Sequence, residues 1–265
     1  MEVPALSVQD LTVRYPGSDT DAVRHVSLDL RSDKVVVVGP NGCGKTTLLK
    51  TVLGLTPVTS GSVRVFGRDV RTVRGELGVG TNLAEVYRLM TVPVGGLLSL
   101  WSDLKGGSEE EVRRWVEEFG LQEILGRPLH RLSTGQMKLV GDLLALAYGP
   151  RLVLLDEPFD NVDFGRRHRY IELLARSSAA VMMNTHEIEL LPAFPSWGLY
   201  FMFEGQLIGR FRAGDLDRLY VNRGPRPEAL ATFRTSVGEV SVTLDQGDVP
   251  MKGASNLSYL LERVA

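Results

Sequence analysis

The sequence has few of the features that mark secreted or membrane-spanning proteins. It contains a single cysteine in 265 residues, which excludes an internal disulfide. No apolar run approaches the roughly 18 residues that a membrane-spanning helix needs, and the most apolar long segment, 190–203, is interrupted by Pro192 and Pro195. The first residues also lack the basic and apolar regions of a signal peptide. We therefore expect a cytoplasmic protein.

The chain also lacks an excess of charge of either sign. Its 30 Lys and Arg residues nearly balance its 32 Asp and Glu residues, and no block of basic residues stands out. Because proteins that grip nucleic acid usually carry such a basic surface, we expect no nucleic-acid partner. With 43% apolar and 23% charged residues, the chain is expected to fold as one large or two unequal globular domains.

A glycine-rich motif, G-x-x-x-x-G-K-T, spans residues 39–46 and follows four consecutive valines. Its glycines allow a tight turn in which several backbone N–H groups point at one anion. The helix expected to begin near Lys45 adds its positive end, Lys45 adds a charge for the β- and γ-phosphates, and the Thr46 hydroxyl suits Mg²⁺. The sequence therefore predicts a nucleotide-phosphate site. Its expected residues are Gly39, Asn41, Gly42, Gly44, Lys45, Thr46 and Thr47.

A second element is the apolar run 152–155, which is followed by Asp156 and Glu157. This pattern is typical of a strand buried on both faces of a parallel sheet. Successive strand residues point to opposite faces, so the two carboxylates are expected to have different roles. We expect Asp156 to hold Mg²⁺ and Glu157 to orient and deprotonate the water that attacks the γ-phosphorus.

Between these elements, Ser133 and Gln136 have the spacing of a capping box at the start of a helix. This segment is either only a helix cap or a second phosphate-binding end, since its exposed amides and hydroxyl suit an anion. One chain cannot easily turn both phosphate-binding ends toward the same γ-phosphate. The second interpretation therefore indicates two chains that share the nucleotide.

Four segments in this order resemble the ATPase subunit of ABC transporters. They match the Walker A, signature, Walker B and switch-histidine motifs, and the resemblance covers residues 5 to about 212. The segments are 39–47, 132–136, 152–158 and 181–186.

The resemblance implies a site shared by two subunits, with ATP and Mg²⁺ as its ligands. Lys45 and Thr46 of one subunit would bind the phosphates and Mg²⁺. The signature residues of a second copy, or of a paralogous ATPase subunit, would close over the γ-phosphate. These are Ser133, Gly135 and Gln136. His186 would contact the γ-phosphate and position the attacking water together with Glu157.

Two further residues, Tyr15 and Asp163, each have two possible interpretations. Tyr15 resembles the aromatic residue that stacks on adenine, or else it is a plain turn residue. Asp163 lies in a segment that resembles the loop crossing the dimer interface, or else it is only the N-cap of a helix over 164–176.

Two positions depart from the family pattern. Asn82 stands where the family usually carries a glutamine that contacts Mg²⁺, and it is one methylene shorter. We still expect Asn82 to belong to the metal site, reaching the ion through a water. In the signature, Thr134 replaces the usual glycine, and its Cβ restricts the backbone near the phosphate.

The resemblance implies an α/β fold, a phosphate-loop ATPase with a mostly parallel core sheet and an antiparallel side sheet. We expect the ATPase domain at 1–212, with a helical insert at about 84–150 that carries the signature motif. A small α+β extension is expected at 213–265. The apolar segment from Leu89 to Trp101 either packs within the insert or receives a helix of a membrane subunit.

The expected function is that of an ATPase subunit that dimerises around two ATP molecules and drives a separate transmembrane permease. It would lie at the inner face of the cell membrane. Two alternatives remain at this point: a soluble ATPase switch of the same family without a membrane partner, and a degenerate subunit with little turnover.

Overall fold

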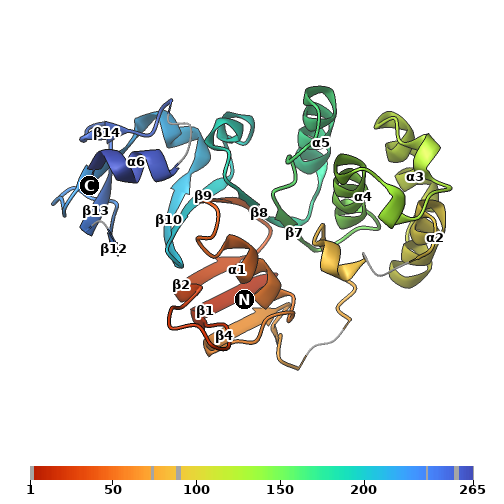
Figure 1. The fold of residues 1–265 in the computed structure, drawn as a ribbon, viewed down its shortest axis with the longest axis horizontal. Helices are drawn as coiled ribbons and strands as arrows, with labels where there is room; N and C mark the ends of the chain where they lie inside the picture. Colours follow the sequence, from red (N-terminus) through yellow and green to blue (C-terminus); the bar gives the residue numbers. More distant parts are fainter. Residues whose placement is uncertain (1–2, 73–74, 88–90, 237, 254–256, 265) are drawn as a thin grey trace. The chain divides into compact units, whose positions relative to one another are not determined.

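The computed structural model describes residues 3–72, 75–87, 91–236, 238–253 and 257–264. The chain forms two compact units. Unit 1 comprises Met1–Val73 and Asn184–Ala265, and unit 2 comprises Arg74–Met183. In Figure 1, unit 2 is the yellow-to-green middle of the chain, and unit 1 contains its red and blue ends.

Unit 1 contains a four-stranded antiparallel sheet in the order β2-β1-β4-β5. Buried residues of β2 alternate with more exposed ones, as expected of a sheet with one apolar face. The buried residues are Val23, Val26, Leu28 and Leu30. The prediction of an antiparallel side sheet is confirmed. The strands are β1 (Leu6–Val13), β2 (Val23–Leu30), β4 (Ser60–Val65) and β5 (Arg68–Asp69).

A second group of strands in unit 1 is β10-β9-β3. Strand β3 (Lys34–Val38) pairs in parallel with β9 (Gly198–Phe203), and β9 pairs antiparallel with β10 (Gln206–Arg212). The four valines of β3 are fully buried, which explains their uninterrupted apolar run. Helix α1 (Lys45–Val52) follows β3 after the glycine-rich turn.

In unit 2, the strand order is β6-β7-β8. Strand β6 (Val79–Thr81) runs parallel to β7 (Leu152–Asp156). The last two residues of β8 (Ala180–Thr185) already belong to unit 1. Parallel pairs in both units, beside the antiparallel side sheet, confirm the predicted fold class.

The helices of unit 2 include the predicted insert. They are α2 (Val94–Lys105), α3 (Glu109–Glu118), α4 (Thr134–Leu146) and α5 (Phe164–Arg176). On α2, Val94, Leu97 and Leu98 are buried while Leu100 and Leu104 are exposed, so the helix has both a packed and an open face. Leu89 and Met90 of the predicted apolar segment lie outside the described residues.

Side-chain caps fix where these helices begin. The Ser108 hydroxyl accepts a hydrogen bond from the Glu111 N–H at 3.3 Å, and Asp163 Oδ1 accepts one from the Arg166 N–H at 3.1 Å. Each cap satisfies a backbone donor that the helix leaves unpaired. The predicted helix over 164–176 and its Asp163 cap are confirmed.

Short 3₁₀ segments connect the main elements. They are η1 (Ala84–Val86), η2 (Gln122–Ile124), η3 (Leu129–Arg131), η4 (Ile188–Ala193) and η5 (Ala213–Arg218).

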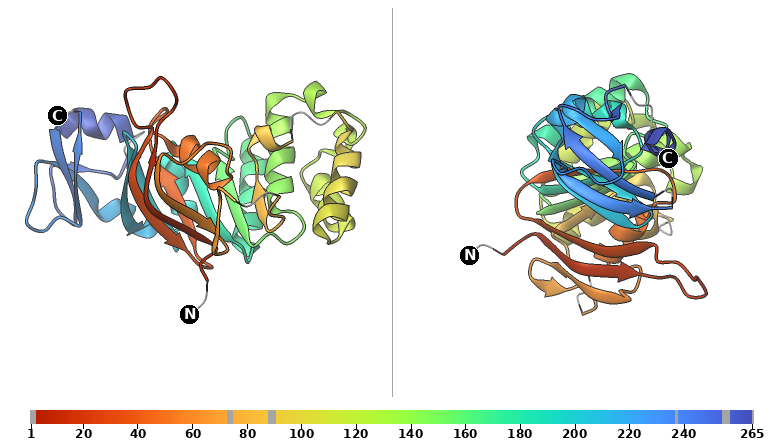
Figure 2. Two further views of the ribbon diagram at one scale, coloured as in Figure 1. Left: turned by 90° about the horizontal axis from the view of Figure 1, so that it is seen from below. Right: turned by 90° about the vertical axis from the view of Figure 1, so that its left-hand side faces the viewer.

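The C-terminal part of unit 1 contains a four-stranded antiparallel sheet in the order β12-β13-β11-β14 and the helix α6. The predicted α+β extension is therefore present (Figure 2). Its elements are β11 (Leu219–Arg223), β12 (Ala231–Thr235), β13 (Gly238–Leu244), β14 (Val249–Pro250) and α6 (Leu257–Val264).

This extension packs on the hairpin formed by β9 and β10. Phe233 of β12 stacks on Phe203 of β9, with ring centroids 5.4 Å apart and planes inclined by 10°. Beside the rings, the Ser236 N–H and hydroxyl donate to the Glu204 carboxylate, and Gln206 Nε2 donates to the Arg234 carbonyl at 2.6 Å. An apolar contact with a polar border therefore fixes the extension to the hairpin.

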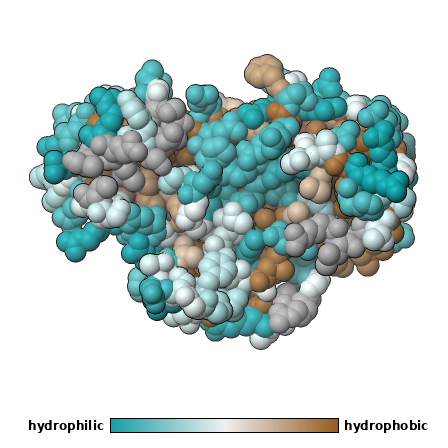
Figure 3. Space-filling view, in the orientation of Figure 1, coloured by the Kyte–Doolittle hydropathy of each residue, from teal (hydrophilic) through white to brown (hydrophobic). Residues whose placement is uncertain are grey.

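The face seen in Figure 3 is largely hydrophilic, with hydrophobic residues scattered between polar ones. Among the described residues, no helix combines the length and apolar character that crossing a bilayer requires.

The contact between α4 and β6 generates a stability prediction. A Cβ at Gly80 would lie 1.8 Å from the Ala145 carbonyl oxygen, so Gly80→Ala must push α4 away from β6. We expect Gly80→Ala to lower the free energy of unfolding by about 3 kcal/mol, measured by urea denaturation. Gly126→Ala is the matched control, since its Cβ would meet nothing within 4 Å. Equal stabilities of the two variants would contradict the close approach.

Candidate functional site

The predicted phosphate loop lies in unit 1 between β3 and α1. Gly44 is the N-cap of α1 and has a φ of 110°, and Lys45 is the first helical residue, as predicted. The Gly39 N–H donates to the Thr185 carbonyl at 3.2 Å, which attaches the start of the loop to the end of β8. The positive end of the α1 dipole therefore lies where the loop turns back.

The loop is held so closely that two of its glycines leave no space for a side chain. A Cβ at Gly39 would lie 2.5 Å from the Met202 carbonyl oxygen, and a Cβ at Gly44 would lie 2.2 Å from the Ala22 carbonyl oxygen. Packing therefore requires glycine at both positions, and the positive φ of Gly44 requires it there as well.

Lys45 is only 5% exposed, and its side chain folds back over the loop. Its Nζ donates to the Gly39 carbonyl at 2.6 Å and to the Pro40 carbonyl at 3.2 Å. Thr46 is half-buried beside it, while Asn41 and Gly42 are exposed. The loop therefore combines an ammonium group, a hydroxyl and a helix N-terminus, a set of groups suited to phosphate oxygens.

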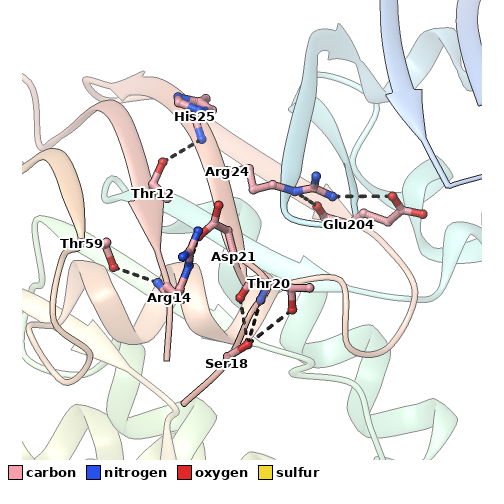
Figure 4. Close-up of polar contacts among 9 residues, drawn as sticks. All are labelled: Thr12, Arg14, Ser18, Thr20, Asp21, Arg24, His25, Thr59 and Glu204. Atoms are coloured by element: carbon pink, nitrogen blue, oxygen red, sulfur yellow. Dashed lines mark hydrogen bonds and ion pairs between the residues drawn. The ribbon is translucent and has the colours of Figure 1, made fainter. Parts of the chain in front are cut away.

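Tyr15 is brought to this loop by the connection between β1 and β2. Its hydroxyl is 3.1 Å from Thr47 Oγ1, and the residue remains 43% exposed. Polar contacts brace the connection: Arg14 Nε bonds Asp21 at 2.7 Å, and the Arg14 N–H donates to Thr59 Oγ1 at 2.9 Å (Figure 4). An exposed ring beside a phosphate loop suits stacking on a planar base.

The turn after β9 holds the loop from another side, and sequence reasoning missed it. The Gly205 N–H donates to the Cys43 carbonyl at 2.9 Å, and the Arg24 N–H donates to the Gly205 carbonyl at 2.7 Å. Arg24 Nε also donates to the Glu204 carbonyl at 2.8 Å (Figure 4). The Glu-Gly pair between two apolar segments was the available signal of a tight turn.

His186 follows Thr185 directly, at the end of β8. Thr185 is buried and its carbonyl accepts the hydrogen bond from Gly39, whereas His186 is half-buried. The structure therefore brings Tyr15, the phosphate loop and the end of the histidine segment together within unit 1.

In unit 2, the carboxylate pair lies at the end of β7. Residues 152–155 are fully buried, and Asp156 and Glu157 are half-buried. Glu157 has a φ of 46°, in the left-handed region that side chains other than glycine rarely adopt. Such a conformation costs roughly 1–2 kcal/mol, and strain of this kind concentrates at functional sites.

Asn82 lies beside Asp156 and is 3% exposed. Its Oδ1 accepts a hydrogen bond from the Asp156 N–H at 2.8 Å. Its Nδ2 donates to the Asp156 carbonyl at 3.1 Å and to Asp142 Oδ1 at 2.6 Å. Both ends of the Asn82 amide are therefore engaged within unit 2.

Asp142 is a fully buried carboxyl on α4 that sequence reasoning missed. Burial raises the pKa of Asp142 to about 7, against the opposing effect of Lys138, and its Oδ2 has no hydrogen-bond partner among the described residues. The Tyr170 hydroxyl donates to the Asp142 carbonyl at 3.2 Å. An acidic residue within the apolar face of a predicted helix was the available signal.

The signature segment begins α4 with a full capping box. The Gln136 N–H donates to Ser133 Oγ at 3.2 Å, and the Ser133 N–H donates to Gln136 Oε1 at 3.1 Å. Ser133 and Thr134 are exposed, so the helix N-terminus is open to a ligand. A Cβ at Gly135 would lie 2.6 Å from the Asn161 carbonyl oxygen, which explains glycine at this position.

Comparisons with known proteins agree with this arrangement. A family model described as "ABC transporter" matches residues 23–160. A protein of Archaeoglobus fulgidus described as an ABC transporter ATP-binding protein is 32% identical over 189 residues, covering 68% of this chain and 79% of that protein. The taurine import ATP-binding protein TauB of Escherichia coli is 34% identical over 191 residues, covering 69% of this chain and 74% of that protein.

A solved structure extends the likeness beyond the ATPase motifs. It is described as that of a cobalt transport ATP-binding protein. Its TM-score against this chain is 0.90, and the two sequences are 29% identical. The match covers 98% of this chain and 100% of that chain, so it includes the C-terminal extension.

The fold and the ordered motifs define a phosphate-loop ATPase. The chain belongs to the ATP-binding subunit family of ABC transporters.

The buried Asp142 generates a prediction of pH dependence. Its pKa is about 7 in the folded protein and 3.8 in its unperturbed state, so the folded state holds this proton more tightly. Its contribution to stability is therefore full below about pH 4 and is lost as the pH rises to about 7. From pH 5 to pH 8, we expect wild type to lose on the order of 2 kcal/mol of unfolding free energy relative to Asp142→Asn. Parallel curves for the two proteins would contradict this.

Proposed function

We propose that this chain binds and hydrolyses ATP and transmits the energy to a separate transmembrane permease. The observation that supports it most is the phosphate loop, whose Lys45 side chain, glycine turn and helix N-terminus converge on one position. We propose residues 1–212 as the ATPase domain and 213–265 as an extension that braces the turn behind this loop.

The nucleotide would lie along unit 1. Lys45 and the loop N–H groups bind the β- and γ-phosphates, and the Tyr15 ring stacks on the adenine. Gly39, Asn41, Gly42, Gly44 and Thr47 complete this site.

Mg²⁺ suits the donors present, because the half-buried Thr46 hydroxyl and Asp156 carboxylate are hard oxygen ligands. When bound, the ion neutralises charge that develops on the phosphate oxygens. Thr46 and Asp156 would hold it, and the Asn82 side chain bonds the backbone of Asp156.

Hydrolysis is assigned to Glu157 and His186. Glu157 accepts a proton from the attacking water while the water oxygen bonds to the γ-phosphorus and the bond to ADP breaks. His186 contacts the γ-phosphate and orients the water. The left-handed backbone of Glu157 supports this role, because the strain must be maintained by its surroundings.

The signature helix would act on a second subunit, either another copy or a paralogous ATPase. Its N-terminus is exposed and carries Ser133, Gly135 and Gln136, which suit the γ-phosphate held by that subunit. ATP then favours the closed dimer because it contacts both subunits, and cleavage removes those contacts. Dimer closing and opening at the cytoplasmic face of the membrane would drive the permease. The transport functions named for its relatives support this coupling.

The proposed function predicts the behaviour of Glu157→Gln. This variant keeps the shape of the side chain but cannot accept the proton, so ATP-dependent dimers should accumulate while phosphate release falls at least about 100-fold. Light scattering with MgATP and a phosphate-release assay would measure these effects. Wild-type turnover in this variant would remove Glu157 from its role.

A second substitution tests the shared site. Glu157→Gln combined with Ser133→Arg should still bind MgATP but should remain monomeric, because the arginine side chain blocks the exposed helix N-terminus. Dimers of this double variant at wild-type affinity would contradict the role assigned to Ser133.

A further inference from the structure

We propose that Asn82 and Asp142 form a positioning pair that fixes the backbone of Asp156, so that Asn82 acts on the metal site through Asp156 rather than as a ligand. The inference rests on the proposed function, because it concerns the carboxylate assigned to Mg²⁺.

The Asn82 amide binds both backbone polar groups of Asp156. Its Oδ1 accepts from the Asp156 N–H at 2.8 Å, and its Nδ2 donates to the Asp156 carbonyl at 3.1 Å. The ladder between β6 and β7 pairs Thr81 with Leu154, and the Asn82 side chain extends that pairing beyond the end of β6. The backbone that carries the Asp156 carboxylate is therefore held by a side chain where regular pairing stops.

Asp142 sets the orientation of that amide. Its Oδ1 accepts from Asn82 Nδ2 at 2.6 Å, so both Nδ2 hydrogens have acceptors and the Oδ1 has a donor. Rotating the amide by half a turn would set its oxygen against a carboxyl oxygen and its NH₂ against the Asp156 N–H. A carboxyl oxygen at this position thus selects the orientation that pairs with Asp156.

The surroundings leave no space for a different arrangement. Asn82 is 3% exposed and Asp142 is fully buried. The Tyr87 hydroxyl donates to the Asn82 carbonyl at 2.7 Å, and a Cβ at Gly141 would lie 2.0 Å from that hydroxyl oxygen. One added methylene at position 82 would therefore displace Asp156, Asp142 or both.

The pair also joins two functional segments. Asp142 lies on α4, the helix whose N-terminus is capped by Ser133, and Lys138 of the same helix donates to the Asp156 carbonyl. Through Asn82 and Lys138, the position of α4 determines the position of the Asp156 carboxylate. Groups that orient a metal ligand in this way typically change metal affinity by 10–100-fold when they are removed.

The test measures binding, not turnover. In Glu157→Gln protein, the Kd of a fluorescent ATP analogue is measured with MgCl₂ and with EDTA. The Kd in EDTA divided by the Kd in MgCl₂ is the gain in affinity due to Mg²⁺, called the gain below. Adding Asp142→Leu should reduce this gain at least about tenfold. Its affinity in EDTA should stay within about twofold, which shows that the phosphate loop remains folded. Asp142→Asn keeps an acceptor oxygen and should restore most of the gain.

Asn82→Gln separates positioning from direct ligation. If Asn82 were a ligand, the longer amide would keep or raise the gain due to Mg²⁺, whereas a positioning residue loses it. Asn222→Gln is the matched control, since Asn222 is another buried asparagine, 1% exposed, whose Nδ2 donates to Thr243 Oγ1 at 2.9 Å in the C-terminal sheet. It should leave the gain unchanged.

The outcomes separate this inference from the proposed function. An unchanged gain in Asp142→Leu, or a gain kept by Asn82→Gln, overturns the positioning pair while ATP binding stands. Failure of the Glu157→Gln protein itself to bind the ATP analogue overturns the proposed function and the inference with it. Amide hydrogen exchange at Asp156 adds a second readout, which should be faster in Asp142→Leu than in Asp142→Asn.

Discussion

The close approach of backbone to backbone around the phosphate loop is the constraint on which the rest of the structure depends. A loop that aims several N–H groups at one anion makes few regular backbone hydrogen bonds of its own, so other segments must hold it. Here Thr185 and Gly205 bond the loop, and Ala22 and Met202 press against it. Only glycine at positions 39 and 44 permits that contact. The loop conformation is therefore stabilised by three other parts of unit 1, which are the side sheet, the β9–β10 turn and the end of β8.

Unit 2 meets a comparable demand by different means. The pairing of β6 with β7 ends at Thr81 and Leu154, and beyond it the Asn82 amide bonds the Asp156 backbone. This network is not fully satisfied, because Asp142 Oδ2 has no partner among the described residues. Burying an incompletely paired carboxyl costs stability, and an apolar residue would pack there at lower cost. The buried carboxyl of Asp142 therefore favours the geometry of Asp156 at the expense of stability.

Local patterns predicted much of this molecule. The glycine motif, the start of α1 at Lys45, the helix over 164–176 with its Asp163 cap and the capped start of α4 depend on residues close together in sequence. Side-chain contacts across long separations could not be read in the same way. The bonds of Asn82 join residues 60 and 74 positions apart, and they depend on strand register and helix packing. The bonds of Glu204 with Ser236 and Arg24 likewise join residues that are far apart in the sequence.

The stacked rings of Phe203 and Phe233 make the C-terminal extension more than an addition to a complete domain. Phe203 is 2% exposed, and the Phe233 ring of β12 stacks on one of its faces. Without the extension, this face of the Phe203 ring would be open to water, and the Glu204 carboxylate would lose Ser236 but keep Arg24, 3.6 Å away. Chimeras that exchange extensions between relatives must therefore exchange positions 203 and 204 together with the extension, because each of these contacts needs one residue from the hairpin and one from the extension.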